Sequence, residues 1–317
     1  METVRIGTRR SLLATTQAAH VAQLIRTRLG RHTELVEVTT EGDRSQDAGT
    51  PLSSFGGTGV FVGALRDALL AGRVDVAVHS LKDLPTYPAD GITLAAVPSR
   101  EDPRDAFVAR DGLTLGELPV GSRIGTGSPR RRAQLHALGL GLEVVDVRGN
   151  VDTRISKVHS GEYDGVVLAR AGLARIGRLE EVTEVLDPLL MLPAPGQGAL
   201  AIECRTGDDL VADLAGLEDP RARAAVDAER AVLATLEGGC SAPIGALAEV
   251  AEGDDGDELW VRAVALSPDG ALTVRKSASG APTDAAGVGS RLADEMLADG
   301  AGQLNEPPAE PAKVQNA

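Results

Sequence analysis

Residues 60–85 read VFVGALRDALLAGRVDVAVHSLKDLP, and this stretch decides the fold class. Its first part, residues 60–70, places apolar side chains on one stripe at helical spacing. Residues 74–78 are short and valine-rich, which is typical of a buried strand. Polar residues follow the strand, and Pro85 disfavours helix at the residue before it. The stretch therefore predicts a helix, a buried strand and a polar turn at the strand's carboxyl end.

The same alternation extends to both sides of this stretch. Residues 12–29 have the length and periodicity of a helix, and Ser11 is placed to cap it. Strands are predicted at residues 4–7, 35–39, 123–125, 143–147, 164–168 and 199–204, and helices at residues 130–138 and 151–159. Because strands and helices alternate, the order predicts an α/β fold with a parallel sheet and helices on its faces.

The C-terminal third has a different order of elements. A helix is predicted at residues 221–236, three strands between residues 246 and 276, and a second helix at residues 284–297. That order suggests a small α+β domain. Residues 305–317 are rich in Pro, Glu and Ala without periodicity, and we expect them to form a disordered tail.

Composition narrows the class of protein. At 317 residues the chain is too long for one ordinary core, which suggests two or three domains. The formal net charge of −14 disfavours a nucleic-acid partner. No apolar run approaches the ~20 residues of a membrane span, and the N-terminus lacks the apolar segment of a secretory signal. We therefore expect a soluble cytoplasmic protein without a nucleic-acid or membrane partner.

Positive charge is carried mainly by arginines, and these are clustered. Lysine occurs only at Lys82, Lys157, Lys276 and Lys313. Guanidinium groups bind planar oxyanions bidentately, so clustered arginines fit a pocket for carboxylates or phosphates.

The segment 124–135, IGTGSPRRRAQL, is the most informative of these clusters. Ser128 suits an N-cap and Pro129 the first helical position, so a helix should begin here. Three consecutive arginines then occupy the first turn, where the helix dipole disfavours cations. A bound anionic ligand would offset this unfavourable interaction between the arginines and the helix dipole. A solvated basic helix start is an equal alternative.

Two more strand-to-helix junctions repeat the pattern. Arg148 follows a predicted strand, Asn150 is placed to cap the next helix, and Arg154 lies one turn into that helix. Arg9 follows the first strand, directly ahead of the capping position at Ser11. If the three junctions converge on the same sheet edge, they would make a pocket for a polycarboxylate ligand.

Chemically reactive groups are few. Asp83 and Lys82 follow the buried strand 74–78 at the end where open α/β sheets collect functional groups, so Asp83 is a candidate general acid or base. A solvated Lys–Asp turn would look the same. Cys240 lies in a glycine-flanked loop and is the better thiol candidate, whereas Cys204 ends an apolar strand and fits a buried core.

Other local features are less specific. No His or Cys cluster has metal-ligand spacing, so we expect no metal site. The glycine-rich segment 53–60 would serve either as a mobile lid or as an ordinary flexible loop.

Five segments, in this order, resemble the hydroxymethylbilane synthase (porphobilinogen deaminase) family over residues 4–300. They are AVHSLKDLP at 77–85, REDPRDAF at 100–107, RGNVDTR at 148–154, LPAPGQGAL at 192–200 and LEGGCSAPIG at 236–245. The resemblance implies two domains like type II periplasmic binding proteins plus a small C-terminal α+β domain. The first domain would take residues 1–98 and 199–216, the second residues 104–192 and the third residues 221–303.

The resemblance also implies a reaction. The enzyme would condense four porphobilinogen molecules head to tail, with loss of ammonia, and release linear hydroxymethylbilane by hydrolysis. Cys240 would hold a dipyrromethane cofactor through a thioether bond. Asp83 would contact the pyrrole N–H groups, assist the loss of ammonia and stabilise the azafulvenium cation, because a carboxylate stabilises developing positive charge.

Further roles carry over position by position. The residues that match acetate- and propionate-binding positions are Arg9, Ser11, Lys82, Thr126, Ser128, Arg130, Arg131, Arg148 and Arg154. Gly196 and Gln197 would lie close by, in the hinge or the cleft wall. The family also suggests a monomer.

The chain departs from the family pattern at four positions. Leu12 stands where many members have proline, Gly127 where they have serine, and Thr58 where a lysine is frequent. Arg132 adds a cation beside the Arg130–Arg131 pair.

Two other functions remain as alternatives. A two-lobed protein with an arginine-lined cleft would also serve as a non-catalytic anion-binding protein. A thiol-dependent acyltransferase that uses Cys240 would need a nearby base. A simple binder needs neither Cys240 nor Asp83, and this distinguishes it from the synthase.

Overall fold

The computed structural model describes residues 3–39, 59–236, 243–253 and 256–304. Four predicted features therefore lie outside the described residues: the glycine-rich segment up to residue 58, Thr58 itself, Cys240 and the tail 305–317. In the described part of the chain, no helix is both long and apolar enough to cross a membrane.

The first sheet has the strand order β2-β1-β3-β10-β4. Its strands are β1 (Val4–Thr8), β2 (Thr33–Glu37), β3 (Val76–Ser80), β4 (Ile92–Ala96) and β10 (Leu200–Arg205), and its helices are α1 (Leu12–Leu29), α3 (Gly59–Leu70) and α7 (Leu210–Leu214). The predicted parallel pairing holds for β1 with β2 and β3, but β10 is antiparallel to β3 and β4. The sheet is mixed because β10 enters it from the second sheet rather than through a helical crossover.

The second sheet repeats this plan in the order β7-β6-β8-β5-β9. Its strands are β5 (Asp105–Ala109), β6 (Arg123–Gly125), β7 (Glu143–Val145), β8 (Gly165–Ala169) and β9 (Glu184–Val185), and its helices are α4 (Pro129–Ala137), α5 (Val151–His159) and α6 (Arg170–Arg175). Here β5, which arrives from the first sheet, is the antiparallel strand. Each larger sheet thus holds one strand delivered by a crossing segment. The α/β fold class with two similar units is confirmed.

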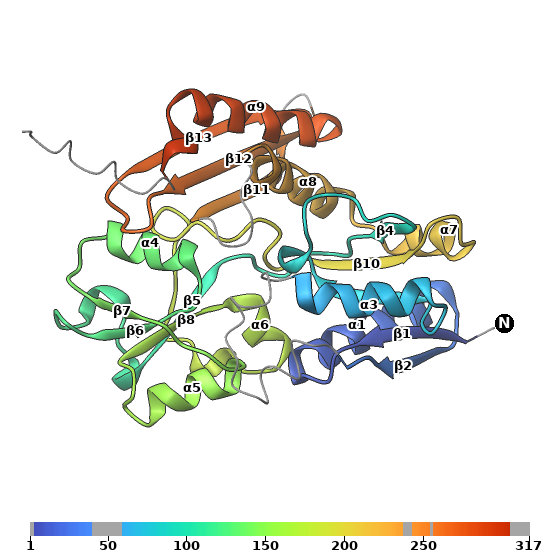
Figure 1. Ribbon diagram of the computed structural model, residues 1–317, viewed down its shortest axis with the longest axis horizontal. Coiled ribbons are helices and arrows are strands. Elements are labelled where there is room, and N and C mark those ends of the chain that lie inside the picture. The colour runs from blue at the N-terminus through green and yellow to red at the C-terminus, as the bar shows by residue number, and fades with distance from the viewer. Residues whose placement is uncertain (1–2, 40–58, 237–242, 254–255, 305–317) are drawn as a thin grey trace, which may run out of the picture.

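The third sheet confirms the small α+β unit. Its three strands are antiparallel: β11 (Ile244–Gly253), β12 (Gly256–Leu266) and β13 (Thr273–Gly280). One core joins this sheet to helices α8 (Pro220–Thr235) and α9 (Ala285–Ala298). A smaller cluster, which includes Ala133 of α4 and Leu247 and Val264 of the sheet, packs this unit against the second sheet's helix. Figure 1 shows the unit lying across the other two, with α8 next to β10.

Sequence-predicted caps position the helices that border the cleft. The Ser11 hydroxyl accepts a hydrogen bond from the Ala14 N–H at the start of α1. Ser128 and Asn150 cap α4 and α5 in the same way. Each cap fixes the first turn of its helix, and the predicted ligand-binding arginines lie just before these turns or within them.

Candidate active site

Three adjoining cavities lie where the two larger sheets meet. The main cavity has a volume of about 330 Å³, and Leu233 of α8 and Ile244 of β11 line one side of it. The second cavity, about 240 Å³, lies between α1, α5 and α6, and the small cavity, about 90 Å³, lies beside β3 and α1. Asp83 lines the main and small cavities, and Lys82 lines the main and second cavities.

The predicted strand-to-helix junctions do converge, but from two sheets rather than along one edge. The first sheet contributes Arg9 and Ser11 after β1, and Lys82 and Asp83 after β3. The second sheet contributes residues at the starts of α4 and α5. Two sheets can face each other here because the chain crosses between them twice.

Asp83 lies on a single 3₁₀ turn, Leu81–Asp83, that directly follows β3. The Leu81 side chain is fully buried, and the carbonyls of Leu84 and Pro85 accept hydrogen bonds from Arg230 of α8. The buried Leu81 side chain fixes the start of the turn, and the hydrogen bonds from Arg230 fix the residues that follow it. The Asp83 carboxylate is half-buried and makes no hydrogen bond or ion pair within the described chain. A carboxylate with no protein partner at a cavity wall is available to a ligand.

Lys82 is the second group on this turn. Its Nζ donates a hydrogen bond of 3.2 Å to Oε1 of Gln197, which lies on the segment returning from the second sheet. Burial lowers the pKa of Lys82 to about 8, and the charges of Arg131 and Arg130 act in the same direction, against those of Asp83 and Asp105. Lys82 is therefore a cation that can lose its proton close to physiological pH.

Arg130 and Arg131 of α4 share one buried carboxylate. Nη2 of Arg130 and Nη2 of Arg131 each lie 2.8 Å from a different oxygen of Asp105, the first residue of β5. Although burial alone would raise the pKa of Asp105, the two arginines hold it well below its usual range. Asp105 is thus an anion that fixes both guanidinium groups.

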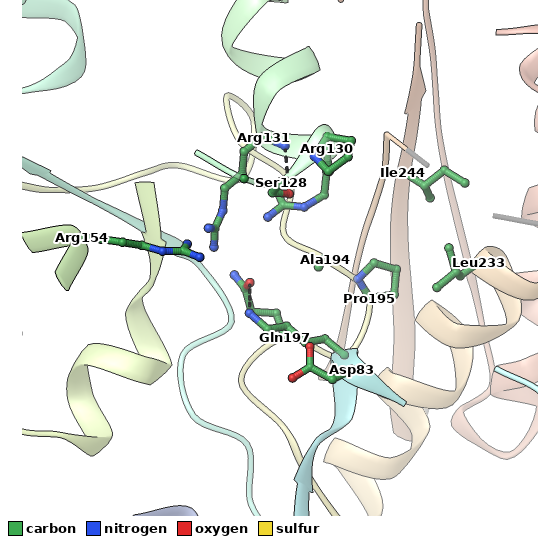
Figure 2. A pocket seen from close by; sticks show the side chains of 13 residues that line it. Asp83, Ser128, Arg130, Arg131, Arg154, Ala194, Pro195, Gln197, Leu233 and Ile244 are labelled. Atoms are coloured by element: carbon green, nitrogen blue, oxygen red, sulfur yellow. Dashed lines mark hydrogen bonds between the residues drawn. The ribbon is translucent and has the colours of Figure 1, made fainter. Parts of the chain in front are cut away.

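Arg154 of α5 completes the cationic wall. Its Nε donates to the Gly149 carbonyl at 2.9 Å, and within the described chain its terminal nitrogens make no hydrogen bond. Burial lowers its pKa to about 10, helped by the nearby charge of Arg131, so it stays protonated at neutral pH. Figure 2 shows Arg131, Arg154 and Gln197 pointing into a common space, with Asp83 beside Gln197.

Three other residues considered from the sequence, Thr126, Arg148 and Arg132, do not line the main cavity. Thr126 is buried and lines none of the three cavities; its hydroxyl accepts a hydrogen bond from the Ser128 N–H at 3.2 Å. Arg148 is exposed and also lines none of them. Arg132 turns away to the Val144 carbonyl and the Asp146 carboxylate, so the extra cation of this chain does not enter the main cavity.

A second buried carboxylate, Glu229 of α8, links the C-terminal α+β unit to the two segments that connect the larger sheets. These two segments contain Arg100 and Gly196. It accepts hydrogen bonds from Nη1 and Nη2 of Arg100 at 2.7 and 2.9 Å. It also accepts from the backbone N–H groups of Gly196 at 2.6 Å and Ala248 at 2.8 Å. Neither Glu229 nor Asp105 was predicted from the sequence. For Asp105 the available signal was the apolar run that follows it directly, which marks the head of a buried strand.

Cys240 lies outside the described residues. On either side of it, α8 ends at Thr235 and β11 begins at Ile244. Leu233 of α8 and Ile244 both line the main cavity. Among the described residues, no group of three or more His, Cys, Asp or Glu side chains is arranged to hold a metal ion.

Comparisons with known proteins agree with this arrangement. Residues 4–213 match the family model "Porphobilinogen deaminase, dipyromethane cofactor binding domain", and residues 224–298 match "Porphobilinogen deaminase, C-terminal domain". The porphobilinogen deaminase of Mycobacterium bovis (strain BCG / Pasteur 1173P2) is 58% identical over 307 residues, which cover 95% of this chain and 98% of the relative. That of Nocardia farcinica (strain IFM 10152) is 56% identical over 307 residues, covering 95% and 87%.

Among solved structures, a periplasmic substrate-binding protein of an ABC transporter from Coxiella burnetii is similar with a TM-score of 0.43 and 14% identity, covering 68% of this chain and 92% of that one. The two family models together extend over nearly the whole chain, and the sequence relatives are more than half identical along it. This chain belongs to the porphobilinogen deaminase family.

Proposed function

We propose that this chain condenses four porphobilinogen molecules head to tail, with loss of ammonia, and then releases linear hydroxymethylbilane by hydrolysis. The observation that carries the proposal is the Asp83 carboxylate, which has no partner within the described chain and faces a wall of cations across the main cavity. The identity to porphobilinogen deaminases does not favour the alternative of a non-catalytic anion-binding protein.

The residues around the main cavity fit a dipyrromethane cofactor tethered to Cys240. Leu233 and Ile244, which lie in the described chain before and after the segment that contains Cys240, both line the main cavity. The Nε atoms of Arg130 and Arg131 are buried without a hydrogen-bond partner in the described structure, a costly state that suits a site completed by an anionic ligand. When bound, the cofactor supplies the pyrrole carbon to which the first substrate unit is joined.

Asp83 supplies the charge that the reaction needs. Loss of ammonia from porphobilinogen leaves positive charge on the pyrrole, and a fixed carboxylate beside that ring stabilises it. The 3₁₀ turn holds this carboxylate at the shared wall of two cavities, so it can contact a pyrrole N–H from either side. We assign Asp83 as the catalytic residue on this basis.

The cations around Asp83 hold the acetate and propionate groups. Arg154 presents its terminal nitrogens, and Lys82 its ammonium group, to the main and second cavities. The remaining residues assigned to carboxylate binding are Arg9, Ser11, Ser128, Arg130, Arg131 and Gln197. Thr126 acts indirectly, through its hydrogen bond to Ser128, and Arg148 acts from the rim next to Gly149.

The working unit is a cytoplasmic monomer of three domains. We take residues 1–98 with 199–216, residues 104–192 and residues 221–303 as the domains. The net charge of −14 argues against nucleic acid and anionic membranes as partners.

Replacing Asp83 by asparagine tests the proposal. Asp83→Asn should keep the cofactor, seen in the intact-protein mass, but lower kcat by at least about a hundredfold, because the amide cannot offset the charge on the pyrrole. Asp90→Asn is the matched control, since Asp90 is an exposed aspartate in the same loop. Near-normal turnover in Asp83→Asn would remove Asp83 from the mechanism.

A further inference from the structure

Asp105 lies behind the cavity wall and is the carboxylate around which its cations are arranged. Its side chain is 0% exposed and lines none of the three cavities, so it touches no ligand there. It nevertheless accepts hydrogen bonds from three side chains that do line the main cavity: Arg130, Arg131 and Gln197.

The two arginines depend on Asp105 for their placement. Their other terminal nitrogens donate to backbone carbonyls, Arg130 to Leu192 at 2.5 Å and Arg131 to Val167 at 2.9 Å. Carbonyls orient a guanidinium group but do not neutralise it. No other carboxylate in the described chain bonds to either arginine. Two like charges in a buried site repel each other, so the shared carboxylate is what allows them to lie side by side.

Asp105 also decides how Gln197 faces Lys82. The Gln197 amide nitrogen donates to Oδ1 of Asp105 at 2.7 Å and to the Pro103 carbonyl at 2.8 Å, both of which can only accept. This leaves the amide oxygen as the atom that faces the Lys82 ammonium, 3.2 Å away. A flipped amide would turn its own N–H groups toward the cation.

We propose that Asp105 is a positioning residue for carboxylate binding: it holds Arg130 and Arg131 side by side and, through Gln197, directs the Lys82 ammonium into the main cavity. The inference rests on the proposed function, since the carboxylates to be bound are those of porphobilinogen and the cofactor. One buried carboxylate organises three cations, which leaves the wall with an excess of positive charge for an anionic ligand.

The charge of Asp105 also favours the protonated form of Lys82. Burial lowers the pKa of Lys82 to about 8, Arg131 and Arg130 lower it too, and Asp83 and Asp105 oppose them. Removing the charge of Asp105 takes away one of the two groups that favour the ammonium form. Lys82 should then lose its proton at a lower pH.

The titration of Lys82 can be measured without turnover. The chain has four lysines, so acetylation by acetic anhydride at a series of pH values, read from peptide masses, reports Lys82 separately. Lys157 and Lys276 are internal references, since hydrogen bonds to Glu162 and Asp299 raise their pKa values. In Asp105→Asn, the Lys82 titration should move down by about one pH unit.

Two further readouts separate positioning from simple destabilisation. Asp105→Asn should lower the fraction of protein that carries the cofactor in the intact mass, and should raise KM about tenfold with a smaller change in kcat. Asp105→Glu should restore part of each effect. The matched control is Asp75→Asn, because Asp75 also pairs with two arginines, Arg5 and Arg205, but lies away from the cavities. It should lower Tm without changing the Lys82 titration, cofactor content or KM.

A Lys82 titration and KM equal to those of the unsubstituted protein would overturn the proposal, whatever the Tm of Asp105→Asn. If that variant does not fold, Gln197→Leu decides, because it cuts the link to Lys82 and leaves the arginine pairs intact. An unchanged Lys82 titration in Gln197→Leu overturns the link. Failure of the unsubstituted chain to condense porphobilinogen would instead contradict the proposed function, and the Lys82 titration would still test Asp105.

Discussion

Two buried carboxylates, Glu229 and Asp105, have the same chemistry but differ in the number of cations around them. Both side chains are 0% exposed, and both gather donors from segments far apart in the sequence. Glu229 takes one arginine and two backbone N–H groups. Asp105 takes two arginines and a glutamine that in turn contacts Lys82.

The difference is one of charge balance. One arginine against one carboxylate leaves the Glu229 cluster neutral, with its hydrogen bonds directed inward, as expected of a joint between structural units. Two arginines against one carboxylate leave the Asp105 cluster positive, and the cavity lies on its open side. A buried ion cluster with unbalanced charge is therefore a better indicator of a binding site than the burial of charge itself.

Breaking the balanced cluster should have the largest effect on stability. Glu229→Gln leaves Arg100 buried without a counter-ion and should lower the free energy of unfolding by about 3–5 kcal/mol, measured by denaturant titration. Glu249→Gln removes the exposed pair with Arg262 and should cost less than about 1 kcal/mol. Equal stability of the two variants would show that Glu229 does not stabilise the contact between the structural units.

Removing a cation from the positively charged wall of the main cavity should weaken ligand binding and have less effect on stability. Arg154→Leu should raise KM by about tenfold to a hundredfold, since a charge-assisted hydrogen bond contributes about 1.5–3 kcal/mol. Arg132→Leu is the control on the neighbouring helix, because its guanidinium pairs with exposed Asp146 outside the main cavity. A similar KM in both variants would contradict the assignment of Arg154.

Features that depend on neighbouring residues could be predicted from the sequence, whereas features that depend on residues far apart in the chain could not. The caps Ser11, Ser128 and Asn150 follow from local chemistry, and the helices they start are where they were predicted. Strand β5 was not predicted, although the apolar residues 106–109 are a local signal for it. The burial of its first residue, Asp105, is explained only by arginines about 25 residues further on.

The antiparallel strand β10 was predicted as a strand but not in its direction, for a similar reason. Its place in the first sheet depends on the chain's return from the second sheet, which no local pattern records. The candidate site shows the same division. Asp83 and the arginines were candidates from their positions after strands, and the family resemblance gave them roles. Asp105 and Glu229 became apparent as functional residues from their tertiary contacts.

The pH dependence of binding should follow the protonation of Lys82, which Gln197 links to the Asp105 cluster. Lys82 has a folded-state pKa of about 8, below the ordinary value of 10.5, so its ammonium form is complete well below pH 8. We expect kcat/KM to hold steady up to about that pH and to fall as the proton is lost above it. Lys82→Met should remove this basic limb, and Lys157→Met should keep it. A basic limb that survives in Lys82→Met would assign it to another group.

The lowered pKa of Lys82 also has a consequence for stability. Between the folded-state value of about 8 and the unfolded value of 10.5, the unfolded chain binds more protons than the folded one. The cost of burying the Lys82 charge is therefore fully present below pH 8 and is relieved as pH rises through this window.

The smallest expected effect concerns Gly127, which lines the main cavity. A Cβ atom there would lie 3.1 Å from the Val147 carbonyl oxygen, so a side chain requires a small shift of the backbone. Gly127→Ser should cost about 1 kcal/mol of stability and change KM only slightly. A large fall in KM would mean that the family's usual serine hydroxyl was a missing ligand contact.

The covalent cofactor on Cys240 is the feature on which the proposed function depends most directly, and the intact-protein mass tests it. The freshly purified, active protein should exceed its sequence mass by about two pyrrole units, whereas Cys240→Ser should have the mass of the unmodified chain and no activity. An unmodified mass in active protein, or an unchanged adduct in Cys240→Ser, would contradict the assignment of Cys240 as the tether.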